Sequence, residues 1–499
     1  MAGIRKQTIQ SSIIVYFGFA VGALNMYLYA MKGSFTTDQF GLTRLFIDFA
    51  QNIFAFASLG TIPVLYKFYP YYKDNLARKN NDLLGRVLVM CLIGFLLVTL
   101  GGIVFEPLVV QKFGEKSKLF LPFYYYLFPF SLGYLFFAVL EGFAWALQKT
   151  VMSNALKETV WRIIITVFIF LYFFKLISFT TFMYLFSASY LIIALALLAY
   201  LWNTGELYLT LKQSIVTRKF KKKMLGLQFF VYGGICLNAV AITISGILIA
   251  SKNGLTDTGI FSLAAYTASL IEVPQRSIVS VTTSTLSRAW KDKNFENINR
   301  IYHRSSINML LLSLFVFGNV WLNVAQGITV LHIQNAYLQG ISVVFILGIA
   351  KIIDAGTGVN SVIIATSTLW KFEFYTGVVL LGLRIPLAYI FLVKFGIIGP
   401  AYAELVSQLV YNFIRYEFLR RKFNMQPFNT ETLYAVLLGS IAVSTTYFLF
   451  QGMEGWLGII IRSVLFSGVL IGGMFVLKLT PDAIQLVDVA KTRIQDWKK

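Results

Sequence analysis

Charged residues are scarce in this sequence. Asp, Glu, Lys and Arg make up 13% of its 499 residues, whereas soluble domains average roughly 25%. Hydrophobic residues account for 57%, which is more apolar surface than a water-soluble fold can hide. A lipid bilayer accepts that surface, provided that the backbone is hydrogen-bonded within helices. The composition therefore predicts an all-α integral membrane protein and excludes a soluble domain.

Cysteine and histidine are also rare, with two of each. Cys91 and Cys236 lie in apolar runs and indicate no disulfide framework. His303 and His332 have no partners at the spacing of a metal site or a catalytic triad. No predicted outer loop is long enough for a catalytic domain. We therefore expect no metal, no cofactor and no enzyme activity.

Apolar runs of about 20 residues recur along the chain, and this is the length that a helix needs to cross a bilayer. We expect about fourteen transmembrane helices. They lie near residues 9–31, 41–64, 83–105, 120–147, 157–175, 180–202, 225–250, 258–284, 305–328, 339–366, 371–393, 397–419, 432–451 and 457–478.

Basic residues outnumber acidic residues by 43 to 22. Most of them fall on the same side of the predicted spans, including the cluster Lys219–Lys223 and the group of Arg415 with Arg420–Lys422, and the cytoplasmic side carries such an excess. We therefore expect both termini in the cytoplasm. Because Lys219–Lys223 lies between two predicted spans, we interpret it as a topology signal beside anionic headgroups and expect no nucleic-acid partner.

Two stretches of the chain repeat each other at a nearly constant offset. Thr37-Asp38 is matched by Thr256-Asp257, and Tyr72-Lys73-Asp74 is matched by Trp290-Lys291-Asp292. Arg86 and Arg304 share this offset, and each opens a predicted helix. Each repeat holds six helices, an even number, so both repeats face the same way across the membrane.

The repeat predicts four parts. They are an N-terminal six-helix lobe (1–202), a cytoplasmic linker (203–224), a C-terminal six-helix lobe (225–425) and an extra helix pair with a cytoplasmic tail (426–499). Two parallel lobes suit alternating access, in which a cleft between them opens to either side of the membrane.

Four short motifs lie in or beside the predicted spans. They are Thr36-Thr37-Asp38-Gln39-Phe40-Gly41, Ser58-Leu59-Gly60-Thr61, Asn360 with Ala365-Thr366-Ser367, and Phe395-Gly396-Ile397-Ile398-Gly399-Pro400-Ala401. In order and spacing they resemble the multidrug/oligosaccharidyl-lipid/polysaccharide (MOP) exporter superfamily, in its branch of O-antigen-type flippases. The resemblance covers about residues 5–425. The sequence departs from the family at Pro400, where a small residue is usual.

This resemblance implies a MATE-like fold and a multi-pass protein of the bacterial inner membrane. It implies transport of an undecaprenyl-pyrophosphate-linked oligosaccharide, such as an O-antigen or capsule unit, from the cytoplasmic to the periplasmic leaflet. Its partners would be the lipid-linked oligosaccharide, the bilayer and other polysaccharide-assembly proteins.

Ionisable residues inside the predicted spans indicate what a cleft could bind, since such residues are costly in lipid and usually face the bundle interior. A pyrophosphate requires cations, because they replace its hydration with charge-assisted hydrogen bonds. We expect Arg276, Lys351 and Arg384 to line a cationic cavity, with Arg44 nearer the periplasmic end.

Acidic residues accompany these cations. The spacing predicts same-helix pairs for Arg44 with Asp48, Glu272 with Arg276, and Lys351 with Asp354. Such pairs could instead hold helices together, and Asp48 or Asp354 could bind a coupling H⁺ or Na⁺. The remaining candidates for ion pairs or coupling are Glu141 and Glu404, and Glu404 or Asp354 could be the partner of Arg384.

Pro274 lies between Glu272 and Arg276, and a proline within a span permits a bend. We expect a hinge there, with a static kink as the alternative. Two other transport functions also fit the sequence. They are a flippase for lipid II, the peptidoglycan precursor, and a MATE-type cation-coupled exporter of small molecules.

Overall fold

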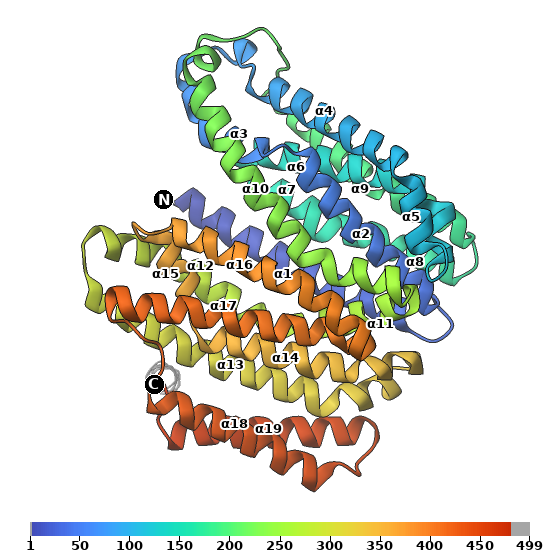
Figure 1. Ribbon diagram of the computed structural model, residues 1–499, viewed down its shortest axis with the longest axis vertical. Coiled ribbons are helices and arrows are strands. Elements are labelled where there is room, and N and C mark those ends of the chain that lie inside the picture. The colour runs from blue at the N-terminus through green and yellow to red at the C-terminus, as the bar shows by residue number, and fades with distance from the viewer. Residues whose placement is uncertain (1, 481–499) are drawn as a thin grey trace, which may run out of the picture. The chain divides into compact units, whose positions relative to one another are not determined.

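The computed structural model describes residues 2–480, and this part of the chain is built from helices. Figure 1 shows them coloured along the chain. They form two compact units, residues 1–259 and the part that begins at Ile260. The predicted cytoplasmic tail lies outside the described residues from position 481 onward.

The first unit contains ten α-helices and three segments of 3₁₀- or π-helix, and the eleventh α-helix begins in it. The elements are α1 (Ala2–Ala30), α2 (Thr37–Ala57), α3 (Thr61–Asn75), η1 (Arg78–Asn80), α4 (Leu83–Val104), α5 (Glu106–Phe113), η2 (Lys118–Tyr126), α6 (Leu127–Ala146), α7 (Thr150–Asn154), η3 (Ala155–Val160), α8 (Trp161–Phe173), α9 (Phe179–Asn203), α10 (Ile215–Lys252) and the start of α11 (Leu255–Ser269).

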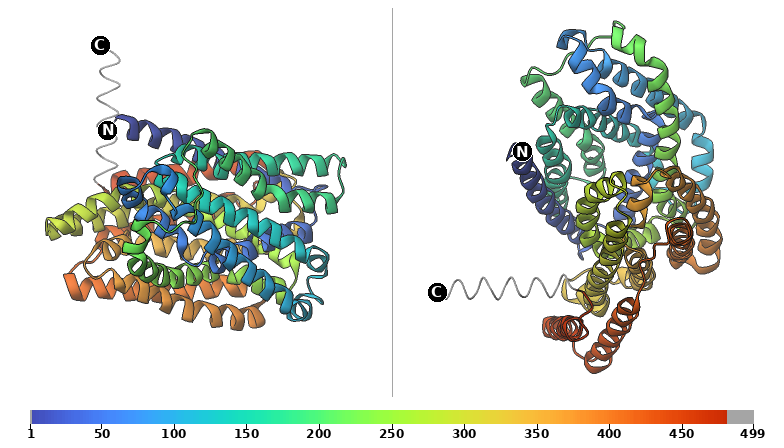
Figure 2. Two further views of the ribbon diagram at one scale, coloured as in Figure 1. Left: turned by 90° about the horizontal axis from the view of Figure 1, so that it is seen from above. Right: turned by 90° about the vertical axis from the view of Figure 1, so that its left-hand side faces the viewer.

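The second unit continues α11 and ends with two helices side by side. Its elements are η4 (Leu270–Glu272), α12 (Val273–Lys291), α13 (Phe295–Val330), η5 (Asn335–Gly340), α14 (Ile341–Gly356), α15 (Asn360–Thr366), α16 (Lys371–Phe395), η6 (Gly396–Ile398), α17 (Gly399–Phe423), α18 (Thr430–Phe450) and α19 (Gly455–Val476). Figure 2 shows the α18–α19 pair, and both of its helices pack on α13.

The predicted span 41–64 is two helices. A capping box starts α2, in which the Thr36 hydroxyl accepts from the Gln39 backbone and the Gln39 amide oxygen accepts from the Thr36 backbone. After Ala57 the chain bends by 52°. Gly60 allows the bend, because its φ is +69° and a Cβ there would lie 2.6 Å from the Gln228 carbonyl oxygen.

Each of the other thirteen predicted spans also overlaps one helix or a broken helix. Nine helical stretches in the described residues are long and apolar enough to cross a membrane, or ten if the bent α2–α3 pair counts as one span. One of the nine, Lys371–Phe423, contains both α16 and α17. The number fourteen and the six-helix repeats remain predictions.

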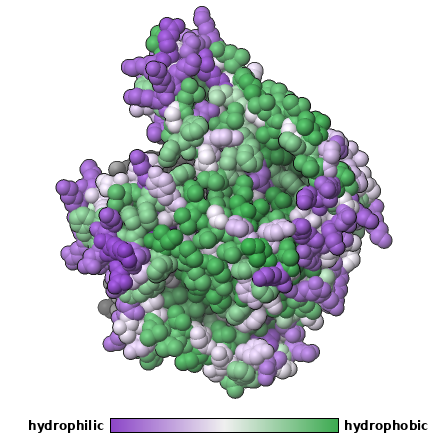
Figure 3. All heavy atoms as spheres, viewed as in Figure 1, coloured by the Kyte–Doolittle hydropathy of each residue, from purple (hydrophilic) through white to green (hydrophobic). Residues whose placement is uncertain are grey.

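Apolar side chains are exposed on the outside of several long helices. On α4, Leu96, Leu97 and Leu100 are 57–61% exposed. Figure 3 shows that hydrophobic residues dominate this face, while hydrophilic residues gather toward the helix ends. Such a surface is stable against lipid and would aggregate in water, so the chain is a multi-pass membrane protein.

Candidate functional site

A network of charged side chains crosses the second unit between η4, α14, α16 and α17. Lys351 on α14 is its first centre. The Lys351 ammonium lies 2.6 Å from a Glu272 carboxylate oxygen and 3.0 Å from a Glu404 carboxylate oxygen. One lysine therefore joins carboxylates from two different elements.

Glu404 on α17 is the second centre of the network. One of its oxygens contacts Lys351 and the other forms an ion pair with the Arg384 guanidinium on α16. The side chains of Glu404 and Arg384 are each 14% exposed, and that of Lys351 is 22% exposed. Because charges so far from water are costly alone, the three groups stabilise each other only as a set.

The turn between α16 and α17 sets the position of Arg384 against Glu404. Gly396, at a φ of +62°, ends α16, and Pro400 lies in the first turn of α17. A proline is tolerated there because its missing N–H has no partner in a helix anyway. The two helices then pack along each other, with Glu404 in the second turn of α17.

After Glu404 along α17, two side-chain amides contact Asp354. One Asp354 oxygen accepts hydrogen bonds from the Gln408 amide at 2.5 Å and the Asn412 amide at 3.0 Å. The Asn412 oxygen in turn accepts from Asn360 and Thr357, each at 3.2 Å. Among the described residues no cation lies within ion-pair distance of Asp354, so neutral donors alone stabilise this carboxylate.

Arg415 follows Glu404, Gln408 and Asn412 along α17. Arg415 forms an ion pair with Glu373 on α16, and its guanidinium lies 3.6 Å from the centre of the Tyr411 ring. The Arg415 side chain is only 5% exposed. Arg415 therefore lies within α17 and packs inside the unit, and its place on the cytoplasmic side stays a prediction.

The structure brings together five of the predicted site residues: Glu272, Lys351, Asp354, Arg384 and Glu404. The same-helix pairs are wrong, however. Glu272 pairs with Lys351 and not with Arg276, and Lys351 pairs with Glu272 and Glu404 and not with Asp354. The carboxylates of Glu272 and Glu404, on neighbouring elements, lie closer to Lys351 than Asp354 does one turn along the same helix.

Arg276 and Pro274 lie at the start of α12. Arg276 is exposed and forms no ion pair with the described residues. Pro274 occupies the first turn of α12, directly after the 3₁₀ turn η4 interrupts the helix. The chain is thus broken at the predicted hinge, and its movement remains a prediction.

The remaining predicted residues lie in the first unit. Arg44 and Asp48 share a face of α2, yet no ion pair joins them. The Asp48 carboxylate instead lies against Gly246 of α10, where a Cβ would collide with it. Glu141 pairs with Lys157, whose ammonium lies 3.1 Å from a Glu141 oxygen. These groups do not form one cluster.

The starts of α2 and α11 cross closely in the first unit. A Cβ on Gly41 would collide with the Leu255 carbonyl oxygen, and a Cβ on Gly259 would lie 2.5 Å from the Thr37 carbonyl oxygen. The Thr256 hydroxyl also donates to Asp38 at 2.5 Å. The offset between Gly41 and Gly259 is that of the sequence repeat.

No family model matches this chain, and no curated protein matches its sequence. Solved structures do match. A structure of the lipid II flippase MurJ in an inward closed conformation superimposes with a TM-score of 0.73 at 14% identity, over 94% of this chain and 98% of that one. This chain therefore has the same fold as that structure.

Two further structures of that fold are similar. An inward-facing multidrug-resistance MATE transporter of the MOP superfamily has a TM-score of 0.66 at 14% identity, over 83% of this chain and 98% of its own. A MOP superfamily transporter from Pyrococcus furiosus, described as having a binding pocket of reverse polarity, has a TM-score of 0.59 at 16% identity. The match covers 84% of this chain and 96% of that one. At these identities the likeness concerns the fold.

The sequence prediction missed Gln408, Asn412, Glu373 and Arg415. A signal was present, because polar residues at 404, 408 and 412 recur every four positions within an otherwise apolar span. This spacing places them on one face of a helix, and such a face inside a membrane protein turns toward the bundle interior.

Proposed function

We propose that this chain is a flippase that moves an undecaprenyl-pyrophosphate-linked oligosaccharide from the cytoplasmic to the periplasmic leaflet by alternating access. Its substrate would be an O-antigen or capsule unit. The observation that carries the proposal is the shared Glu404 carboxylate, with Lys351 on one oxygen and Arg384 on the other.

Two cations around one carboxylate can exchange that carboxylate for a pyrophosphate. Arg384 offers parallel N–H groups that match phosphate oxygens, and Lys351 offers a mobile point charge. Within a poorly solvated bundle these contacts substitute for water around the headgroup. Glu404 would then return to the cations after release, so that they are never left buried without an anion.

The fold supports a flippase with a large lipid substrate. The MurJ structure covers 94% of this chain and the MATE structure covers 83%. The difference is comparable in length to the α18–α19 pair. The close crossing of Gly41 and Gly259 at equivalent repeat positions also supports a chain built from two related halves.

A lipid II flippase is the second candidate, and the likeness to MurJ favours it. Lipid II and an O-antigen precursor carry the same kind of pyrophosphate on a polyprenyl chain, so Lys351 and Arg384 suit both. The charged network therefore distinguishes these two functions from the export of small molecules better than it distinguishes them from each other.

Deletion of the gene in its host tests the proposal. The lipid-linked intermediates that accumulate would be extracted and identified by mass spectrometry. An O-antigen or capsule precursor on the inner leaflet supports the proposal, while lipid II accumulation with lysis supports the second candidate. Normal levels of every lipid-linked sugar, together with drug sensitivity, would overturn both.

A further inference from the structure

A groove of about 380 Å³ opens between α4 and α10 in the first unit. Both helices pack on α3, which forms the floor. Its apolar lining includes Val89 and Met90 from α4 and Leu225 from α10. Val89 and Leu225 are 38% and 48% exposed, so the groove faces outward.

Two basic side chains, Arg86 and Lys221, lie at this groove, and none of its lining residues is acidic. Arg86 is in the first turn of α4, a helix of 22 residues. Such a helix is about 33 Å long at 1.5 Å per residue, close to the thickness of the hydrocarbon core. Arg86 therefore lies near headgroup depth, while Val89 and Met90 lie deeper, among acyl chains.

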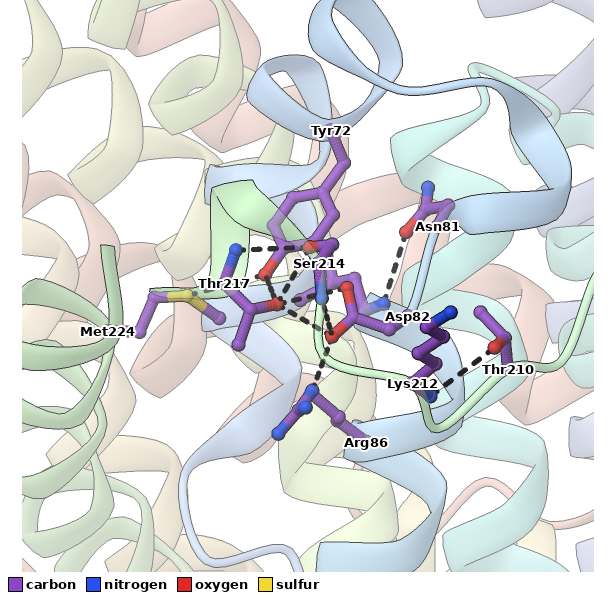
Figure 4. Close-up of polar contacts among 10 residues, drawn as sticks. Tyr72, Asn81, Asp82, Arg86, Thr210, Lys212, Ser214, Thr217 and Met224 are labelled. Atoms are coloured by element: carbon purple, nitrogen blue, oxygen red, sulfur yellow. Dashed lines mark hydrogen bonds and ion pairs between the residues drawn. The ribbon is translucent and has the colours of Figure 1, made fainter. Parts of the chain in front are cut away.

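Asp82 holds Arg86 in place, as Figure 4 shows. This carboxylate is fully buried and accepts from the Arg86 Nε at 2.5 Å and the Thr217 hydroxyl at 2.8 Å. It also accepts from the Ser214 backbone N–H at 3.2 Å. The bond to Arg86 uses only Nε, so the two terminal nitrogens of the guanidinium can bind another anion (Figure 4).

Lys221 belongs to a basic segment at the start of α10, Arg218–Lys223. Its five basic side chains are exposed, and Lys221 is the only one of them that lines the groove. A basic segment at the level of the headgroups attracts anionic lipids. The groove thus combines positive charge at one level with an apolar channel at the next.

We propose that this groove binds one anionic phospholipid. Its phosphate lies against the Arg86 terminal nitrogens and the Lys221 ammonium, and one acyl chain lies between α4 and α10 over Val89, Met90 and Leu225. A bound lipid of this kind is separate from the transported substrate, and the proposal does not depend on the function proposed above.

Native mass spectrometry of the purified full chain in detergent tests the proposal. The protein is titrated with phosphatidylglycerol and with phosphatidylcholine of the same acyl chains. We expect phosphatidylglycerol to bind at least about tenfold more tightly, and Lys221→Gln to weaken it about fivefold, the effect of removing one basic charge at a membrane surface. Equal affinity for the two lipids would overturn the proposal.

Matched variants separate this groove from the general basic surface. Lys222→Gln with Lys223→Gln removes two exposed charges from the same helix turn and should leave binding within about twofold. Leu225→Trp fills the channel, keeps Arg86, Lys221 and Asp82, and should reduce binding at least about tenfold. The proposal would be contradicted if the control lost as much phosphatidylglycerol affinity as Lys221→Gln, or if Leu225→Trp lost none.

A final comparison tests whether the acyl chain is needed. Glycerol 3-phosphate carries a phosphate without a tail, and it should fail to displace phosphatidylglycerol at a hundredfold excess. Displacement at equal concentration would show a site for soluble phosphate compounds and overturn the assignment to a lipid. Arg86→Gln does not serve as a test, because it leaves Asp82 buried without its cation and destabilises the region.

Discussion

Gly41 and Gly259 lie opposite each other where α2 and α11 cross, and each faces the backbone carbonyl of the residue four positions before the other. The arrangement is reciprocal: Gly41 faces Leu255, and Gly259 faces Thr37. Small residues at a crossing let two backbones approach closely, which is a main source of packing energy between helices in lipid. The crossing therefore depends on the absence of a side chain at both positions.

Gly41→Ala should destabilise the protein, because the new Cβ would collide with the Leu255 carbonyl oxygen. Overpacking of this kind costs about 1–3 kcal/mol, and we expect a lower thermal unfolding temperature in detergent. Gly101→Ala is the matched control, since Gly101 is also helical and its Cβ would meet no atom within 4 Å. Alanine there should stabilise α4 by up to about 1 kcal/mol. Equal unfolding temperatures for the two variants would argue against a tight crossing.

Arg384→Ala should slow transport strongly while the protein still reaches the membrane. The variant removes a charge-assisted contact to the headgroup worth about 1.5–3 kcal/mol, or roughly 10- to 100-fold in rate. Export of the lipid-linked sugar would be measured in the deletion strain, and membrane abundance by immunoblot. Arg421→Ala is the control, because Arg421 is exposed on the same hairpin and pairs only with Glu417 among the described residues.

We expect the same loss of export for Arg276→Ala, on the proposal that its exposed side chain contacts the substrate. If Arg276→Ala and Arg384→Ala both export at the wild-type rate, cations of the second unit do not carry the headgroup.

Glu404→Ala should be more destabilising than Glu272→Ala. Removing Glu404 leaves Arg384 without its carboxylate, and breaking a buried ion pair costs about 3–5 kcal/mol. After Glu272→Ala, Lys351 still has Glu404 at 3.0 Å, so the cost should be well below that of Glu404→Ala. Chemical or thermal unfolding of the purified variants would measure this order. The reverse order would show that Glu404 is not the shared partner.

Arg462→Met should loosen the α18–α19 pair. Arg462 is buried on α19, where its Nε donates to Asn323 at 3.1 Å and one terminal nitrogen donates to the Phe450 and Met453 carbonyls. These bonds tie α19 to the last residue of α18 and to the loop that follows it. Hydrogen exchange at residues 445–460 should become faster, with little change in α14. Unchanged exchange would mean that the apolar contacts of α13 suffice.

The positions of the helices could be predicted from the sequence because each apolar run has to bury its own backbone hydrogen bonds in lipid. The breaks are harder to predict. The pattern at Ser58-Leu59-Gly60-Thr61 predicts the end of a span, yet α3 continues to Asn75. Two left-handed residues, Leu59 and Gly60, turn the chain without interrupting its apolar character.

The structure brings five of the predicted site residues together, and Glu404 is the partner of Arg384, but Glu272 and Lys351 do not pair as their spacing along one helix predicts. Spacing along one helix reveals only partners one turn away, so it favours Lys351 with Asp354. The real partners, Glu272 and Glu404, come from elements that are distant from Lys351 in sequence. Such contacts depend on how α14, α16 and α17 pack, and a single sequence does not encode that arrangement in its spacing.

The shared carboxylate of Glu404 has a consequence for how a headgroup could enter. Because Glu404 pairs with two cations, moving that single side chain leaves Arg384 without its carboxylate and leaves Lys351 with Glu272 alone. A headgroup phosphate that enters there would replace the negative charge of Glu404 beside both cations.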